Sequence, residues 1–324
     1  MTNILVKNED HWHALRKQHI GSTDIACLFD AHPRKTRWQL WAEKRGLIAD
    51  VDLSDVSVVK AGKHLEAGIA AWAAEEWGMN LRKVRRYIEH GEAKCLGTSL
   101  DYESSEGQMI PVEIKLHVWG EGWEWGDGAE IADAPLHYLF QCQHHCVVTG
   151  APYAWLVCYS HGNLRRMKVP LRATVAAEII SRGAAFWAAY VAGTKEPPPD
   201  FEEDAEAIQR LVAGKPMASL DLSANDAVIS ACKQMKHATK VEADAAKKKA
   251  GARAEIMKVI MEQTAALGLP DETGARVKAG DYSVVFSSFA ATEPTVITTE
   301  MVGQSYGGRK GYRALRVNEG KEMK

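Results

Sequence analysis

The sequence lacks any run of eighteen apolar residues, the length that a membrane-spanning helix needs. Its first residues, MTNILVKNEDHW, lack the apolar core of a secretory signal peptide. An excess of basic residues is missing too, because 40 Lys and Arg against 42 Asp and Glu give a formal charge of −2. These absences predict a cytoplasmic protein without a membrane partner. The missing basic excess counts mildly against a nonspecific nucleic-acid binder, so any DNA contact must come from local clusters of basic residues.

Paired cysteines are also missing. The six cysteines are scattered without a C-x-x-C pair, which favours reduced thiols. Cys142 and Cys146 are one helical turn apart, but the spacing lacks the four-cysteine pattern of an iron–sulfur cluster. Apolar residues are plentiful, since 46% of the 324 residues are hydrophobic. This is enough for one large domain and a smaller one.

The stretch from Cys95 to Lys115 predicts a hairpin that brings acids and a lysine together. Residues 97–102 form one run, 104–108 (SSEGQ) are a turn cluster, and 110–116 alternate as a strand. If the runs pair antiparallel, Asp101 approaches Glu113, since neighbouring strands lie about 5 Å apart. Two carboxylates at that distance favour a hard divalent cation with oxygen ligands. Taken alone, the tripeptide Glu-Ile-Lys fits the exposed face of an amphipathic strand better than it fits a metal site.

This pattern resembles the PD-(D/E)xK nuclease signature, in which an acid on one strand and E-x-K on the next hold Mg²⁺ beside a catalytic lysine. The matching residues are Asp101, Glu113 and Lys115. The sequence departs from the signature before the first acid, where Ser99-Leu100 stands in place of proline.

Further motifs occur in the order expected of one family. They are WHALR (12–16) with IGSTD (20–24), TRWQLWAEKRG (36–46), GKHLE (62–66) and PLHYLFQCQHHCVVTG (135–150). Together with the hairpin they resemble the lambda-exonuclease-like, YqaJ-type viral recombinase family over residues from about 10 to 195. The resemblance implies an α/β fold with a restriction-endonuclease-like central mixed sheet flanked by helices.

The resemblance also implies roles for individual residues. Asp101, Glu113, the Ile114 carbonyl and Glu66 would hold Mg²⁺, with Mn²⁺ as a substitute. Lys115 would position or deprotonate the attacking water, and Gln141 would orient that water or Lys115. Outside the family context, Glu66 would be an ordinary solvated carboxylate.

A second group of residues matches the family's site for the 5′-phosphate of DNA. It consists of Arg16, Ser22 and Thr23. Hydroxyl groups at a helix N-terminus do bind anions. The alternative is that Asp24 or Thr23 merely caps a helix over 25–29, while Arg16 makes a surface pair.

Two other segments leave two interpretations open. Residues 81–89 carry Arg82, Lys83, Arg85 and Arg86, which fit either phosphate contacts or a charged edge strand that resists aggregation. The loop 118–128 (VWGEGWEWGDG) has three tryptophans, which could stack on bases or simply pack the loop.

The composition predicts three parts. Residues 1–195 would be the nuclease domain, 196–222 a proline-rich linker that begins at EPPPD, and 223–324 an accessory region of helix and strands. The accessory helix has a narrow, alanine-rich apolar seam that needs a partner. That partner could be DNA, another protein or another subunit.

The predicted function is a Mg²⁺-dependent exonuclease acting 5′ to 3′ on linear double-stranded DNA. The resemblance implies that it leaves 3′ single strands for a single-strand annealing recombinase, and that it assembles as a homo-oligomer, with a ring-shaped trimer as the family's form. Two alternatives are an endonuclease with the same site and a DNA-binding scaffold whose site has decayed.

Overall fold

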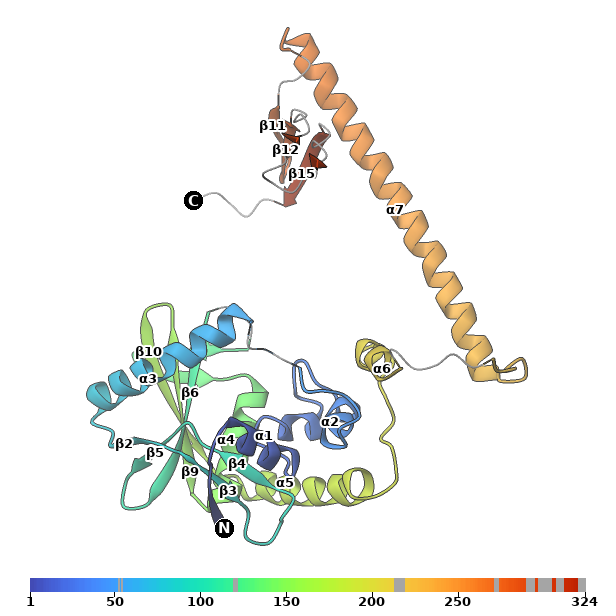
Figure 1. The fold of residues 1–324 in the computed structure, drawn as a ribbon. Helices are drawn as coiled ribbons and strands as arrows, with labels where there is room; N and C mark the ends of the chain where they lie inside the picture. The colour runs from blue at the N-terminus through green and yellow to red at the C-terminus, as the bar shows by residue number, and fades with distance from the viewer. Residues whose placement is uncertain are drawn as a thin grey trace. The chain divides into compact units, whose positions relative to one another are not determined.

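A computed structural model describes residues 1–51, 53, 55–118, 122–212, 219–270, 274–289, 295–296, 305–306 and 312–319. The chain forms two compact units, Met1–Pro216 and Met217–Lys324 (Figure 1). Among the described helices, none has both the length and the apolar character required to cross a bilayer.

The first unit contains most of the regular structure. Its strands are β1 (Thr2–Leu5), β2 (Leu81–Lys83), β3 (Arg86–Glu89), β4 (Gly97–Ser99), β5 (Tyr102–Ser105), β6 (Met109–His117), β7 (Glu124–Trp125), β8 (Ile131–Asp133), β9 (Tyr153–Ser160) and β10 (Asn163–Pro170). Its helices are α1 (Glu9–Lys17), the 3-10 helix η1 (Ile25–Phe29), α2 (Arg37–Lys44), α3 (Ser57–Trp77), α4 (Leu136–Thr149), α5 (Ala173–Phe186), the π-helical turn η2 (Trp187–Val191) and α6 (Ala205–Val212).

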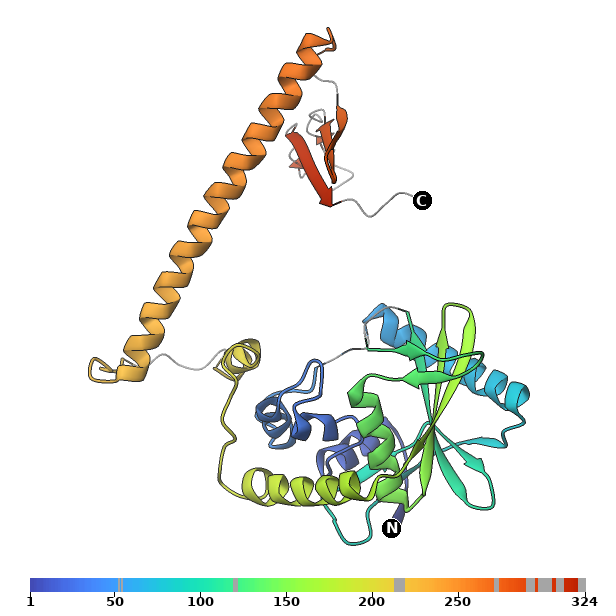
Figure 2. The same cartoon turned by 180° about the vertical axis from the view of Figure 1, so that it is seen from behind.

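A five-stranded mixed sheet forms the centre of this unit, in the order β10-β9-β6-β5-β2. Strands β6 and β9 are parallel, and the other neighbours are antiparallel. Helix α3 covers one face and α4 the other (Figures 1 and 2). The predicted central mixed sheet flanked by helices is therefore confirmed.

Strand β6 is buried on both faces, which decides the environment of the acidic site. Val112 and Ile114 pack with Ile69 and Ala73 of α3. Glu113 points to the other face and is only 2% exposed. The exposed amphipathic strand that E-x-K alone would favour is thus excluded.

The hairpin differs from the predicted one. Strand β4 leaves the central sheet and joins β1 and β3 in a separate three-stranded sheet. The partner of β6 is β5, in a register that pairs Tyr102 with Val112. Residues 104 and 105 belong to β5, and the turn falls at 106–108, where Gly107 has a positive φ of 79°. Asp101 consequently lies where the chain crosses from one sheet to the other.

The alternating runs 153–160 and 164–169 around Gly162-Asn163 predict a hairpin, and the structure confirms it as β9 and β10, with a shifted turn. Asn163 pairs with Ser160, so the two turn residues are His161 and Gly162 rather than Gly162 and Asn163. Both have positive φ, 47° and 84°, which is the backbone of a type I′ turn and matches the strand twist.

Helix α3 packs on the sheet with a face that differs from the one predicted from its sequence. Ile69, Ala70 and Ala73 are buried, whereas Leu65 and Trp72 are 47% and 40% exposed. The helical spacing of 61–77 predicts one apolar face of Leu65, Ile69, Trp72 and Ala73, but only Ile69 and Ala73 of these four are buried. Small alanines at the sheet-facing positions move the larger side chains to the flank.

The segment from Glu196 to Val212, which contains the triproline, packs on the rest of the first unit. Trp38 Nε1 donates to Glu196 Oε1 at 2.7 Å, and Thr36 Oγ1 donates to Asp204 Oδ1 at 2.5 Å. Ala207 is buried in the core that includes Trp38. Residues 196–212 thus belong to the first compact unit, and whether 1–195 folds alone stays a prediction.

The second unit consists of a long helix and a small sheet. Helix α7 spans Asp226–Ala266, and Asn225 caps it by accepting from Val228 N at 3.1 Å. The strands are β11 (Ala275–Ala279), β12 (Tyr282–Phe289), β13 (Thr295–Val296), β14 (Ser305–Tyr306) and β15 (Tyr312–Glu319). Ile260 of α7 packs with Val284 and Phe286 of β12. The predicted helix and strands are confirmed, and most of the α7 surface is exposed.

Candidate active site

Asp101 and Glu113 are brought together by the pairing of β5 and β6. Asp101 precedes Tyr102, which pairs with Val112, so the two carboxylates lie at adjacent positions across the strands. The Ile114 N–H donates to Asp101 Oδ2 at 3.0 Å. This bond fixes Asp101 beside the strand that carries Glu113 and Lys115.

Glu113 is the centre of the polar contacts. Its Oε1 accepts from the Lys115 ammonium and from Gln141 Nε2, the latter at 2.6 Å. Its Oε2 lies 2.8 Å from His145 Nε2. The spacing of four residues between Gln141 and His145 in 135–148 predicts a shared helix face, and both side chains on α4 do contact Glu113.

His145 is a site residue that the sequence interpretation left without a role. Its Nδ1 lies 2.8 Å from Thr98 Oγ1 on β4. The one available signal was its spacing of four residues from Gln141. Thr98 gave no signal, because β4 approaches α4 only in the folded structure.

The two carboxylates have opposite pKa shifts. Burial and the charge of Glu113 raise the pKa of Asp101 to about 7. Burial would also raise the pKa of Glu113, but the Lys115 ammonium and the His145 hydrogen bond outweigh it and hold that pKa at about 2. Lys115 has a raised pKa, because the charges of Glu113 and Asp101 overcome its burial. The site therefore keeps an ammonium between two acids.

Glu66 lies at the edge of this group. It pairs with the Lys83 ammonium, which also stands 4.9 Å from the Tyr102 ring centroid. The charge of Glu66 contributes to the raised pKa of Asp101. The charge of Glu66 thus acts on the acidic pair, while Glu66 itself forms its ion pair with Lys83 of β2.

The donor set is chemically suited to a hard cation. Three carboxylates and the Ile114 carbonyl offer only oxygen ligands, the kind that Mg²⁺ prefers. Within the described residues, no three His, Cys, Asp or Glu side chains are already placed to hold a metal ion. Instead, Lys115 and Lys83 each neutralise one of the acids.

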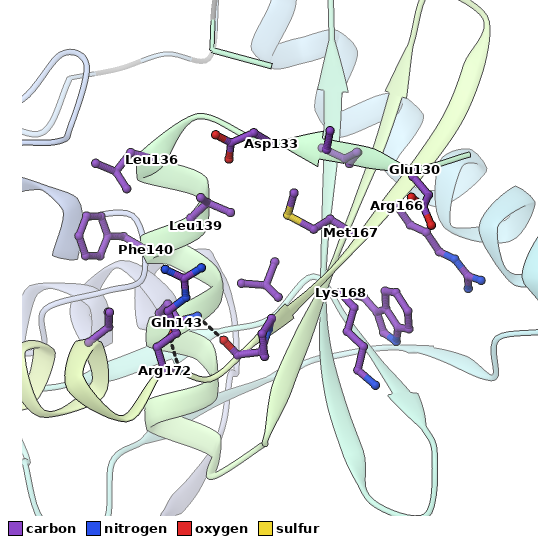
Figure 3. Close-up of a pocket in the computed structure, with 16 residues that line it drawn as sticks. Glu130, Asp133, Leu136, Leu139, Phe140, Gln143, Arg166, Met167, Lys168 and Arg172 are labelled. Carbon is purple, nitrogen blue, oxygen red and sulfur yellow. Dashed lines mark hydrogen bonds between the residues drawn. The ribbon is translucent and has the colours of Figure 1, made fainter. Parts of the chain in front are cut away.

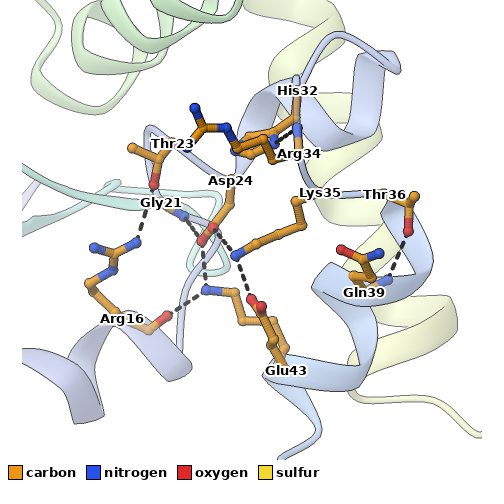
Figure 4. A network of polar contacts seen from close by, with 11 residues as sticks. Arg16, Gly21, Thr23, Asp24, His32, Arg34, Lys35, Thr36, Gln39 and Glu43 are labelled. Atoms are coloured by element: carbon orange, nitrogen blue, oxygen red, sulfur yellow. Dashed lines mark hydrogen bonds and ion pairs between the residues drawn. The ribbon is translucent and has the colours of Figure 1, made fainter. Parts of the chain in front are cut away.

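Arg16 and Thr23 form a second candidate site near the end of α1 (Figure 4). Arg16 Nη2 donates to Thr23 Oγ1 at 3.2 Å, and its guanidinium lies 4.7 Å from the Trp12 ring centroid. Thr23 is exposed and Ser22 is buried. The structure brings Arg16 and Thr23 together, and Ser22 directly precedes Thr23 in the chain.

Asp24 does not cap a helix as the sequence suggested. Residues 25–29 form a short 3-10 helix without a side-chain cap. The Asp24 carboxylate instead accepts from Gly21 N at 3.1 Å and from Lys44 Nζ at 2.7 Å, while Lys35 lies 3.8 Å away (Figure 4). Asp24 therefore ties the 21–24 turn to α2.

The basic residues of 81–89 are largely engaged within the protein. Arg82 Nε donates to Glu103 Oε1 at 2.8 Å, and Arg86 Nη2 donates to Glu103 Oε2 at 2.6 Å. Glu103 is 1% exposed, so these arginines neutralise a buried acid. Strand β2 does form an edge of the central sheet, as the alternative interpretation held.

Two tryptophans of the 118–128 loop contact other aromatic and basic side chains. Trp119 lies outside the described residues. Trp123 and Trp125 stack with ring centroids 5.4 Å apart, and Trp123 lies 5.5 Å from Tyr138. The Arg165 guanidinium stands 5.3 Å from the Trp125 ring. Neighbouring side chains thus contact both tryptophans, as packing of the loop requires.

A pocket of about 590 Å³ lies elsewhere on the unit, between α4 and β10 (Figure 3). Leu136, Leu139 and Phe140 line it from α4, whereas Glu113 faces Gln141 and His145 on another side of that helix. The acidic site is therefore outside this pocket.

The fold and the site define a mixed α/β domain whose central sheet carries an acid–lysine centre against a helix glutamine. Residues 11–152 match the family model described as the YqaJ-like viral recombinase domain. This match confirms, for that segment, the resemblance predicted from the motifs.

Individual relatives are distant. The protein YqaJ of Bacillus subtilis (strain 168) is 26% identical over 154 residues, which are 46% of this chain and 46% of that protein. The match thus spans about half the length of that relative. Among solved structures, the alkaline exonuclease LHK-Exo of Laribacter hongkongensis is 17% identical, with a TM-score of 0.42 over 63% of this chain and 98% of its own. The structure of SSO0001 is 16% identical, with a TM-score of 0.36 over 67% and 90%.

Proposed function

We propose that this protein is a deoxyribonuclease, namely a Mg²⁺-dependent exonuclease that degrades linear double-stranded DNA from 5′ to 3′. The observation that carries the proposal is the buried Glu113, bonded to Lys115 and Gln141 next to Asp101. The match of residues 11–152 to the YqaJ-like viral recombinase domain supports it. The 3′ single strands left behind are the substrate of a single-strand annealing recombinase.

Asp101, Glu113, the Ile114 carbonyl and Glu66 would hold the cation. When bound, Mg²⁺, or Mn²⁺ in its place, neutralises charge at the scissile phosphate and lowers the pKa of a water. Burial and the charge of Glu113 raise the pKa of Asp101, and a bound cation would offset both effects.

Lys115 and Gln141 supply the remaining polar contacts. The Lys115 ammonium pairs with Glu113, and its Nζ also lies 4.9 Å from the Tyr138 ring centroid. An ammonium there stabilises the negative charge that develops on the phosphate and positions the attacking water. Gln141 holds Glu113 Oε1 and so fixes the acid toward Lys115.

Action from a DNA end is supported by the second site. Arg16 and the exposed hydroxyl of Thr23 offer donors to a terminal 5′-phosphate, and Ser22 adds a hydroxyl. A homo-oligomer, such as a ring-shaped trimer, would keep such an enzyme on its DNA. The second compact unit, with its exposed α7, is the part we assign to partner or subunit contacts.

A digestion assay tests the proposal. Linear duplex labelled at the 5′ end and a relaxed closed circle of the same sequence are incubated with Mg²⁺ or with EDTA. We expect label release from the linear DNA only, and only with Mg²⁺. Cleavage of the circle would instead identify an endonuclease, and binding without hydrolysis a decayed scaffold.

A further inference from the structure

His145 links the acidic site to a second sheet. Its Nε2 lies 2.8 Å from Glu113 Oε2 on β6, and its Nδ1 lies 2.8 Å from Thr98 Oγ1 on β4. His145 and Thr98 are 0% and 1% exposed. Buried hydrogen bonds of this kind hold their groups firmly, since no solvent competes for them.

The partners of the ring determine where its hydrogen lies. The Glu113 carboxylate faces the Lys115 ammonium, which favours its ionised, acceptor-only form, so His145 Nε2 must donate. The neutral ring then has an acceptor at Nδ1, and the Thr98 hydroxyl donates to it. The Glu113 carboxylate thereby selects the Nε2–H tautomer of His145, and the Thr98 hydroxyl complements it.

The two oxygens of Glu113 are unequally available. Oε1 accepts from Gln141 and from Lys115, whose side chain is 19% exposed and can move toward a ligand. Oε2 accepts from His145, whose side chain is 1% exposed and is fixed from behind by Thr98. Oε2 is thus committed within the protein, whereas Oε1 can exchange the Lys115 ammonium for another cation while Gln141 keeps its hydrogen bond to that oxygen.

We propose that His145 is a positioning residue that, held by Thr98, reserves Oε2 of Glu113 and leaves Oε1 for the divalent cation. The proposal rests on the proposed function, because it concerns the same metal site. Residues that hydrogen-bond a metal ligand from behind change metal affinity by about 10–100-fold when removed.

Metal binding without DNA provides the first test. Calorimetry measures Mn²⁺ affinity of the full chain for the wild type, His145→Ala, His145→Gln and His144→Ala. The adjacent His144 is also buried, but it makes no hydrogen bond to Glu113 in the described part of the chain, so it is a matched control for the loss of a buried ring.

We expect His145→Ala to weaken Mn²⁺ binding about ten-fold or more, His145→Gln to recover most of it through its amide donor, and His144→Ala to retain wild-type affinity. If the wild type binds Mn²⁺ and the two alanine variants are equal, the positioning role is wrong. If the wild type binds no Mn²⁺, the proposed function itself fails.

The tautomer is the second test, and it does not depend on an alanine variant that folds. Long-range ¹⁵N–¹H spectra, assigned with His145→Gln, distinguish the two neutral ring forms. We expect His145 as the Nε2–H form in the wild type, in Thr98→Ser and in Thr98→Val, because Glu113 and not Thr98 imposes this form. A wild-type ring protonated at Nδ1 alone would overturn the proposal.

Discussion

Lys44 Nζ lies 2.7 Å from Asp24 Oδ2, and the side chains of both residues are almost fully buried. The same ammonium donates to the Arg16 carbonyl oxygen at 2.8 Å. One ion pair therefore connects the last turn of α1, the 21–24 turn and α2. Because Arg16 and Thr23 lie on these segments, the pair sets the geometry of the candidate phosphate site.

Removing the charge of Asp24 should destabilise the fold. Asp24→Asn leaves the buried Lys44 without its counter-ion, and breaking a buried pair costs about 3–5 kcal/mol. The control is Asp30→Asn, which removes an exposed pair with Arg37 and should cost less than about 1 kcal/mol. Urea unfolding of both variants measures the difference, and equal costs would contradict the structural role of Asp24.

The same pair predicts a pH dependence. Burial alone would raise the pKa of Asp24, but Lys44 and Lys35 lower it below its ordinary value. A depressed folded-state pKa gives stability that is complete above the unfolded pKa of about 3.9 and is lost as the pH falls below it. The stability gap between wild type and Asp24→Asn should thus be constant from pH 7 to 5 and narrow below about pH 4. A gap that widens on acidification would refute this assignment.

Asp101→Asn should abolish Mg²⁺-dependent hydrolysis while the fold persists. The amide oxygen can still accept from Ile114 N–H, but the negative charge that a cation needs is lost. Loss of several kcal/mol of charge stabilisation corresponds to at least about a 10³-fold decrease in rate. Single-turnover digestion of labelled duplex measures the rate, with unfolding temperature as the check on folding. Near wild-type turnover would remove Asp101 from the site.

Arg16→Ala should remove the preference for 5′-phosphorylated ends. A charge-assisted contact to phosphate is worth about 1.5–3 kcal/mol, which is a ten-fold effect or more. Exposed Lys17, the next residue of α1, provides the control, since Lys17→Ala alters charge without removing the bond to Thr23. Digestion rates on 5′-phosphate and 5′-hydroxyl duplexes give the preference. Equal rates for the wild type would exclude a 5′-phosphate site.

Truncation separates the two compact units. A chain ending at Pro216 should remain folded and should hydrolyse short duplexes, since every candidate site residue lies before it. A chain ending at Lys195 loses the Glu196 and Asp204 hydrogen bonds and should be less stable by at least about 2 kcal/mol. Thermal unfolding and short-duplex assays compare them. If both are equally stable, the boundary lies at the triproline after all.

Much of the fold was accessible from local sequence patterns. The alternation in 110–116 predicted β6, and the spacing of Gln141 and His145 predicted a shared helix face. Strand boundaries were less accessible, because 97–102 reads as one run and 104–108 as a turn, whereas the structure has strands at Gly97–Ser99 and Tyr102–Ser105. Only pairing with β3 on one side and β6 on the other divides the stretch 97–105 at Asp101.

What the sequence by itself determined are the elements whose periodicity is local and the chemistry that Asp101, Glu113 and Lys115 can offer. The tertiary structure decided which of these groups meet. In the folded protein Glu113 is buried, and His145, itself hydrogen-bonded to Thr98, contacts its carboxylate. Arg82 and Arg86 form ion pairs with Glu103. Such partners lie on separate elements, and their choice follows from the packing of both sheets against α4. That packing balances the desolvation of each charge against the contacts available to it, a balance that no single stretch of sequence contains.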